Sequence, residues 1–165
     1  MSRIVHPFDP LYSENSRVLI LGSFPSVKSR EQQFYYGHPQ NRFWRVIAAI
    51  FEQEPPSTME EKRALILNNA LALWDSIASC EITGSSDVSI RGARANDIGG
   101  ILTACDIRAI YCNGKKSHEL YRKYIQPATG RAAVCLPSTS PANARWTLPR
   151  LIEAWGVIRA AASER

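Results

Sequence analysis

Apolar residues in this chain follow two kinds of pattern, short continuous runs and longer stretches of helical period. The continuous runs are typical of buried strands and cover residues 17–21, 107–112 and 132–136. Residues 71–77 form a fourth apolar run, which predicts either a strand or an irregular core segment. Apolar side chains that recur every three or four residues predict a helix that begins at Pro39 or Asn41 and runs to about residue 53. The same period predicts helices over about residues 59–68, 97–104, 116–125 and 147–162.

Local signals mark several helix boundaries. Ser57 and Thr58 are each followed three residues later by a glutamate, which is a capping-box pattern for the helix that starts near residue 59. Asn96 or Asp97 can cap the next helix, and the helix from residue 41 is stopped by the prolines at 55 and 56. Residues 1–16 show no regular period and predict an irregular surface lead-in.

Strands that alternate with helices predict a parallel sheet covered by helices on both faces. We therefore expect an α/β fold, a three-layer αβα sandwich around a central, mainly parallel four-stranded sheet. A length of 165 residues favours one domain with a single core, over residues 1–165. The carboxyl ends of parallel strands meet at one edge, so the loops at 22–40, 113–116 and 137–143 should lie close together.

The loop at residues 22–40 is long and rich in aromatic side chains. A long loop in a compact domain is unusual unless it is functional or disordered, and this one is too aromatic for a disordered linker. It follows the carboxyl end of a buried strand, where open α/β sheets place their ligands. We therefore interpret it as the active-site loop.

The charge balance narrows the class of partner. Lys and Arg number 20 against 15 for Asp and Glu, giving a net charge of +5. A positive excess favours a polyanion, and nucleic acid above all. The segment 22–29 matches a phosphate-binding Walker loop only in part, because Val27 stands where the second glycine belongs and Pro25 lacks the backbone N–H that such a loop would use. A nucleotide triphosphate site is therefore not expected there.

Cysteine usage and hydropathy indicate the compartment. None of the four cysteines belongs to a C-x-x-C pair, so neither a zinc site nor a local iron–sulfur motif is expected, and no cofactor is predicted. Cys112 and Cys135 lie in apolar runs, where a free cysteine acts as a small hydrophobe. Without a signal peptide or a membrane-length apolar stretch, we expect a reduced, cytoplasmic, monomeric protein that contacts no membrane.

Three loops that follow strands of the predicted sheet carry short motifs. The first loop holds Gly22-Ser23-Phe24-Pro25-Ser26 and then Tyr36 with Pro39-Gln40-Asn41-Arg42-Phe43-Trp44, the second Asn113-Gly114-Lys115, and the third Leu136-Pro137-Ser138-Thr139-Ser140. Across about residues 17–146 this order resembles the uracil-DNA glycosylase superfamily. Within it, the chain is most similar to the hypoxanthine-DNA glycosylase group, whose further marks are matched by Tyr35-Tyr36-Gly37 and Gly84-Ser85-Ser86-Asp87.

The resemblance implies a catalytic amide. Uracil-removing members hold the attacking water with an acidic or amide residue at the third position of the first motif. Here that residue is Phe24, which can neither donate nor accept a hydrogen bond, so uracil removal by the usual route is not expected. In the hypoxanthine group the catalytic asparagine lies farther along, at Asn41 here. Asn41 is also a good helix cap, and one amide can do both.

The same resemblance implies a base pocket and a DNA-binding surface. The base pocket would contain Ser23 and Phe24, with the ring of Tyr36 stacked on the base and the Asn113 amide hydrogen-bonded to the edge of the base. The alternative for Tyr36 is ordinary core packing. The alternative for Asn113 is a turn residue before Gly114. Contacts to DNA are expected from Ser26, Lys115, Ser138, Ser140 and Arg145, with Arg42 and Arg150 as further phosphate candidates and solvated surface as the alternative.

Other polar residues have weaker claims to chemistry. His38 could be a general base and Asp75 or Asp87 an acid, but structural, capping or turn roles are favoured for all three. Lys115 and Lys116 could form a Schiff base, yet the resemblance is to enzymes that use water directly. The leading hypothesis is a monofunctional glycosylase that removes hypoxanthine from damaged DNA in base excision repair. The alternatives are removal of uracil or thymine mismatched with guanine, and a catalytically silent module that binds damaged DNA.

Overall fold

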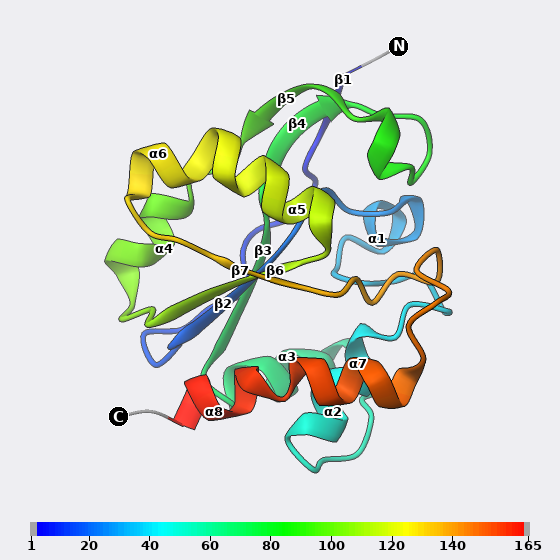
Figure 1. The fold of residues 1–165 in the computed structure, drawn as a ribbon, viewed down its shortest axis with the longest axis vertical. Coiled ribbons are helices and arrows are strands. Elements are labelled where there is room, and N and C mark those ends of the chain that lie inside the picture. The colour runs from blue at the N-terminus through cyan, green and yellow to red at the C-terminus, as the bar shows by residue number, and fades with distance from the viewer. Residues whose placement is uncertain (1–2, 164–165) are drawn as a thin grey trace.

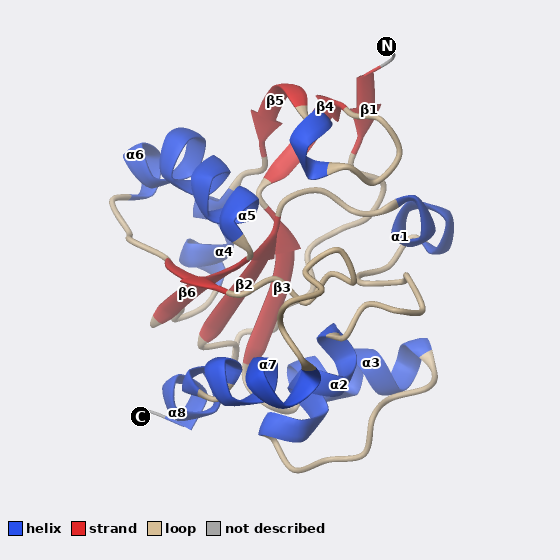
Figure 2. Ribbon diagram, turned by 45° about the vertical axis from the view of Figure 1, so that its right-hand side comes forward, coloured by secondary structure: helices blue, strands red, loops and turns tan. Residues whose placement is uncertain are grey.

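The computed structural model describes residues 3–163, in which the strands form a larger and a smaller sheet (Figures 1 and 2). The lead-in expected for residues 1–16 and the single domain expected for residues 1–165 extend beyond this range to residues 1, 2, 164 and 165. The larger sheet has four strands in the order β3-β2-β6-β7, and every neighbouring pair is parallel. Its strands are β2 (Val18–Gly22), β3 (Leu71–Asp75), β6 (Ala109–Asn113) and β7 (Val134–Leu136). The predicted four-stranded sheet is confirmed.

Helices cover both faces of this sheet, which confirms the three-layer arrangement. Alternate residues of β2 enter two separate cores, with Val18 and Ile20 in one and Leu19 and Leu21 in the other. One face is covered by α2 (Phe43–Ile50), α3 (Met59–Leu67), α7 (Leu148–Trp155) and α8 (Val157–Ser163). The opposite face is covered by α4 (Ile98–Ala104), α5 (Lys115–Leu120), the π-helical turn η2 (Tyr121–Ile125) and α6 (Gln126–Thr129).

Capping signals in the sequence marked helix starts correctly. The Thr58 hydroxyl accepts a hydrogen bond from the Glu61 amide at 3.0 Å, and the Asp97 carboxylate accepts one from Gly100 at 3.1 Å. The helix ends were predicted less well. The expected helix over residues 147–162 is two helices that meet at Gly156, and the one over 116–125 changes from α to π geometry after Leu120.

The smaller sheet was not predicted. It is antiparallel in the order β1-β4-β5, with strands β1 (Arg3–Val5), β4 (Ile77–Glu81) and β5 (Arg91–Ala95). The interpretation of residues 1–16 as a surface lead-in was wrong, since β1 pairs with β4 and the buried Leu11 exchanges two backbone hydrogen bonds with Leu73. Residues 91–95 are partly or fully exposed, so this strand carries no continuous apolar run.

The apolar run at residues 71–77 spans both sheets. Strand β3 ends at Asp75 and β4 begins at Ile77, with the Ser76 amide donating to the Gly22 carbonyl at 2.8 Å between them. The active-site loop also has structure of its own, because α1 (Val27–Gln32) interrupts it and is capped by the Ser26 hydroxyl; a short 3-10 turn, η1 (Asp87–Ser89), lies after β4. No helix within residues 3–163 is long and apolar enough to cross a membrane.

Candidate active site

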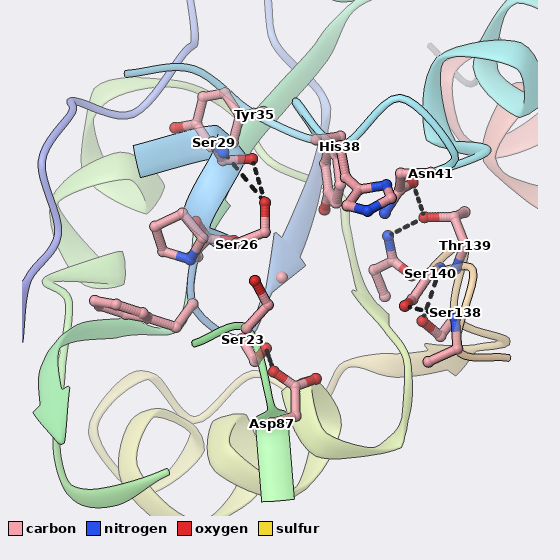
Figure 3. A pocket seen from close by; sticks show the side chains of 18 of the residues that line it. Ser23, Ser26, Ser29, Tyr35, His38, Asn41, Asp87, Ser138, Thr139 and Ser140 are labelled. Atoms are coloured by element: carbon pink, nitrogen blue, oxygen red, sulfur yellow. Dashed lines mark hydrogen bonds between the residues drawn. The ribbon is translucent and has the colours of Figure 1, made fainter. Parts of the chain in front are cut away.

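A cavity of about 290 Å³ opens at the carboxyl ends of β2, β3 and β6 (Figure 3). All three loops expected at this edge of the sheet contribute to its wall. It is lined by Gly22, Ser23, Phe24, Pro25, Ser26, Ser29, Tyr35, Tyr36, His38, Asn41, Asp75, Ser85, Asp87, Asn113, Ser138, Thr139, Ser140, Pro141 and Ala142. The parallel topology therefore gathers segments that lie more than a hundred residues apart in the sequence.

Most of the side chains singled out in the sequence line this cavity, namely Asn41, Tyr36, Asn113, Phe24, Ser23, Ser26, Ser138 and Ser140. Lys115 and Arg145 do not. Both are exposed, and Lys115 borders a separate depression on α5 with His118 and Arg122. Contact of these two side chains with DNA stays a prediction about the surrounding surface.

Asn41 is anchored through its side-chain oxygen. Oδ1 accepts hydrogen bonds from the Phe43 amide and from the Thr139 hydroxyl, each at 2.9 Å. The Phe43 amide can only donate, which fixes the orientation of the Asn41 side chain and leaves Nδ2 as a donor without a hydrogen-bond partner among residues 3–163. The first bond satisfies a backbone amide at the start of α2, so Asn41 supports the helix start and lines the cavity with the same side chain.

Thr139 links the two amides that the sequence analysis treated separately. The Asn113 Nδ2 donates to Thr139 Oγ1 at 3.0 Å, and Asn113 Oδ1 accepts from the Thr139 amide at 3.0 Å. The Thr139 hydroxyl then donates to Asn41, as Figure 3 shows. Thr139 is fully buried, whereas the neighbouring serines that drew attention in the sequence are partly exposed. Its position between two polar residues of the same loop was the only signal in the sequence.

The serines on either side of Thr139 stabilise the loop itself. Ser138 Oγ accepts from the Ser140 amide at 3.1 Å, and Ser140 Oγ accepts from the Ala142 amide at 3.2 Å. Gly114 lies against this loop with a φ of +96°, and a Cβ on it would come within 3.0 Å of Ser138 Cβ. Glycine is therefore required there both for the backbone conformation and for the close approach.

Arg42 holds the loop from the other side. Its guanidinium donates to the backbone carbonyls of Thr139, Ser140, Asn143 and Trp146. The phosphate-binding role considered for Arg42 is therefore replaced by a structural one, because its donors are directed at protein carbonyls. Trp155 Nε1 adds a bond to the Pro137 carbonyl at 2.9 Å, so the loop is fixed at its start as well.

Tyr36 forms one wall of the cavity and has an unusual environment. Its ring stacks on Phe43 with centroids 3.9 Å apart and an interplanar angle of 17°. Its φ of 51° is left-handed, which costs on the order of 1 kcal/mol for a residue with a side chain. The next amide, Gly37, donates to Ser29 Oγ at 2.9 Å, so helix α1 helps to hold this strained turn in place.

The Tyr36 hydroxyl is buried and makes no hydrogen bond within the described residues. Burial, followed by the negative charge of Asp75, raises the pKa of Tyr36 well above its usual range. The nearby Asn113 side chain opposes that rise in the pKa of Tyr36. The phenol therefore stays protonated, and its hydroxyl has no hydrogen-bond partner among the described residues, which is uncommon for a buried hydroxyl.

Phe24 lies at the edge of the cavity with 7% of its surface exposed. It packs in a third apolar cluster with Ile77, Cys80, Ile82, Ile90 and Leu120. The side chain at this position thus supplies apolar contact and no hydrogen bond, in agreement with its chemistry.

Two carboxylates, those of Asp75 and Asp87, line the cavity, although the sequence analysis did not favour a catalytic role for either residue. Asp75 is 4% exposed and accepts a hydrogen bond from His6 Nε2 at 2.8 Å. Asp87 accepts one from Ser23 Oγ at 2.7 Å; desolvation of its carboxyl raises the pKa of Asp87, and the Ser23 bond opposes that rise. A carboxylate at the end of a buried parallel strand, as at Asp75, was the signal available in the sequence.

Comparison with known proteins agrees with the geometry of the site. The family model of the uracil DNA glycosylase superfamily matches residues 10–159. A protein of Methanosarcina acetivorans named hypoxanthine DNA glycosylase is 36% identical over 154 residues, which cover 92% of this chain and 96% of the relative. A second, from Methanosarcina barkeri and with the same name, is 34% identical over 140 residues, covering 84% and 87%.

A solved structure supports the same assignment. The solution NMR structure of a Methanosarcina acetivorans protein proposed to be a uracil DNA glycosylase superposes with a TM-score of 0.80 at 32% sequence identity. The match covers 95% of this chain and 97% of that one. A family match over most of the chain and a shared fold lead to one conclusion: this chain belongs to the uracil DNA glycosylase superfamily.

Proposed function

We propose that this protein is a monofunctional DNA glycosylase that hydrolyses the N-glycosidic bond of deoxyinosine and releases hypoxanthine. The observation that carries the proposal is the Asn41–Thr139–Asn113 hydrogen-bond network on the wall of the cavity, next to the aromatic ring of Tyr36. Two relatives at about one-third identity bear the name hypoxanthine DNA glycosylase, and Phe24 takes away the usual water ligand of the uracil-removing members.

The size of the cavity suits one base. At about 290 Å³ it stands at the lower limit of the roughly 300–1,000 Å³ that is typical of small-molecule sites. A base inside a duplex must first leave the stack, at a cost of a few kcal/mol. Stacking on an aromatic face returns roughly 1–3 kcal/mol per base. Tyr36 offers one face for this purpose, since Phe43 covers the other.

The reaction breaks the bond between C1′ and N9 of the purine, and the bonding electrons leave with the base. The sugar passes through a cation-like state, as in glycoside hydrolysis, and a water oxygen then bonds to C1′. Asn41 Nδ2 can donate to that water while leaving a lone pair for C1′. An amide cannot accept the proton that the water loses, so the departing base, which needs one, is its natural destination.

The DNA is held by the surface around the cavity. The net charge of +5 favours a phosphate backbone, and Ser26, Ser138 and Ser140 lie at the cavity with hydroxyls that can donate to phosphate oxygens. Lys115 and Arg145 are exposed and lie close in sequence to two of the cavity loops, where each can contribute a positive charge. Their role is electrostatic and independent of the base.

The test is a cleavage assay on duplexes that contain deoxyinosine, uracil opposite guanine, or xanthine, with the released base identified by mass spectrometry. We expect hypoxanthine from the inosine duplex, and a loss of at least about 100-fold in single-turnover rate for Asn41→Ala. Asn15→Ala, a change to an exposed asparagine outside the cavity, is the matched control. Release of uracil or mismatched thymine alone, salt-dependent binding without any released base, or full activity of Asn41→Ala would each reject the proposal.

A further inference from the structure

We propose that Val88 enters the base stack of the duplex and fills the place that the extruded nucleotide leaves. The inference rests on the proposed function and adds a positioning residue to it. Val88 lies in the turn η1, directly after Asp87, which lines the cavity. Val88 is 80% exposed, the largest fraction for any exposed large hydrophobic residue within residues 3–163.

The segment before Val88 is the Gly84-Ser85-Ser86-Asp87 motif, to which the proposed function gave no role. Three hydrogen bonds from the active-site loop hold this motif in place: Ser23 Oγ to Asp87 Oδ1, the Val27 amide to Ser85 Oγ, and the Arg30 guanidinium to the Gly84 carbonyl. Ser89 Oγ, on the other side of Val88, accepts from the Thr83 amide at 2.8 Å. The backbone around Val88 is therefore fixed at both ends, so a partner that meets this side chain has little loop motion to arrest.

Exposed apolar surface around the cavity is concentrated at Val88. The exposed residue of the 137–143 loop is Ala142, which offers a single methyl group. Val27, at the start of α1, is 40% exposed, half the fraction of Val88. In Figure 1 the green turn η1, helix α1 and the orange 137–143 loop lie on the same side of the molecule. A duplex that places a base in the cavity would rest on this side.

Arg91 adds a positive charge beside Val88. Its Nη1 donates to the carbonyls of Val88 at 3.0 Å and Ile90 at 2.9 Å, and the residue is exposed. Both bonds use one nitrogen, so the remaining N–H donors of the guanidinium can bond a phosphate. An apolar tip next to a guanidinium matches duplex DNA, in which apolar base faces lie between anionic backbones.

The physical role of such a side chain follows from base extrusion. An extruded nucleotide leaves a gap in the stack, into which it can return before its bond is cut. Apolar side chains inserted between base steps are the usual wedges of proteins that deform duplex DNA. Valine in the gap contacts the flanking bases and opposes the return. Alanine lacks two methyl groups, whose transfer out of water is worth about a 10-fold change in an equilibrium.

The first measurement follows unstacking without bond cleavage. The duplex carries the non-cleavable 2′-fluoroarabino form of deoxyinosine next to 2-aminopurine, whose emission rises when its stacking is lost. We expect saturating wild type to raise the emission, and Val88→Ala and the similarly shaped but polar Val88→Thr to lose at least about half of the rise. Val88→Leu should retain it. Val157→Ala, the same change at an exposed valine of α8, is the matched control.

The second measurement compares single-turnover cleavage of two duplexes, with deoxyinosine opposite cytosine or opposite an abasic site. Without a pairing partner the nucleotide leaves the stack more easily. We expect Val88→Ala to slow the paired substrate by about 10-fold and the unpaired one by less than about threefold. A general structural role would slow both substrates alike. The urea midpoint should stay unchanged, since Val88 is exposed.

The outcomes separate this inference from the proposed function. If the wild type releases no hypoxanthine from either duplex, the proposed function fails. If it does, the role of Val88 alone is overturned by any of three results: no rise in emission with the wild type, a full rise with Val88→Ala, or an unchanged ratio of the two cleavage rates in that variant.

Discussion

Replacing Thr139 by valine removes one hydroxyl from the centre of the active-site network and keeps the shape of the side chain. Thr139 Oγ1 donates to Asn41 Oδ1 at 2.9 Å and accepts from Asn113 Nδ2 at 3.0 Å. Asn41 keeps its bond to the Phe43 amide, and Asn113 keeps its bond to the Thr139 amide. Each asparagine therefore loses one of its two restraints and gains freedom to turn.

The size of the effect follows from burial. Thr139 is 0% exposed, so valine leaves Asn113 Nδ2 without its acceptor and Asn41 Oδ1 with one donor in place of two, in a place that water enters poorly. An unsatisfied buried polar group costs about 1–3 kcal/mol, and we expect the free energy of unfolding to fall by about that amount. A misplacement of about 1 Å at a catalytic group can lower a rate about 100-fold, so we expect a 10- to 100-fold slower single-turnover reaction on an inosine duplex.

The assay combines urea denaturation with single-turnover cleavage at saturating enzyme, below the temperature at which the variant unfolds. Thr139→Ser, which retains the hydroxyl, should keep most of the activity. If Thr139 acts through Asn41, the double variant with Asn41→Ala should be about as slow as Asn41→Ala alone. Activity of a folded Thr139→Val within about twofold of wild type, or equal losses in the valine and serine variants, would refute the reasoning.

Three further predictions concern the surroundings of the site. Gly114→Ala should lower the free energy of unfolding by about 1–3 kcal/mol, because alanine is strained at a φ of +96° and its Cβ would lie 3.0 Å from Ser138 Cβ. Thermal or urea denaturation measures the change in stability, and an unchanged midpoint would contradict the prediction. Lys115→Ala should weaken binding to all duplexes alike and reduce the slope of log K against log salt by about 1, measured by fluorescence anisotropy across a salt series; a loss confined to inosine duplexes would speak for base contact instead. The pKa of Asp87 is raised above its ordinary 3.8, so just above that pH the folded state binds more protons than the unfolded state. The free energy of unfolding therefore falls as the pH rises through this window. Asp87→Asn should remove that fall, and parallel curves of stability against pH for the two proteins would disprove the assignment.

The elements that sequence reasoning located correctly are those whose signals are local. The buried strands of the parallel sheet appear as short apolar runs because both of their faces are covered, and β2 is entirely buried. Helix starts at Met59 and Ile98 were marked by side chains that cap amides only three residues away. The convergence of three loops followed from parallel topology alone.

The smaller sheet could not be found in this way. Strand β5 has partly or fully exposed side chains, and its existence depends on pairing with β4 across a chain reversal. Strand β1 pairs with residues 79–81, far along the sequence. Backbone pairing of this kind leaves no periodic pattern in the side chains, since neither face of these strands needs to be continuously apolar.

The sequence by itself determined the class of fold, the superfamily and eight of the residues that line the cavity, because motif order and apolar runs are properties of neighbouring residues. Only the tertiary structure decided how those side chains are connected. Thr139 joins Asn41 and Asn113, His6 meets Asp75, and Arg42 binds carbonyls. Each of these contacts links residues 26 to 98 positions apart, and hydrogen bonds over such separations exist only once folding has brought their donors and acceptors within about 3 Å.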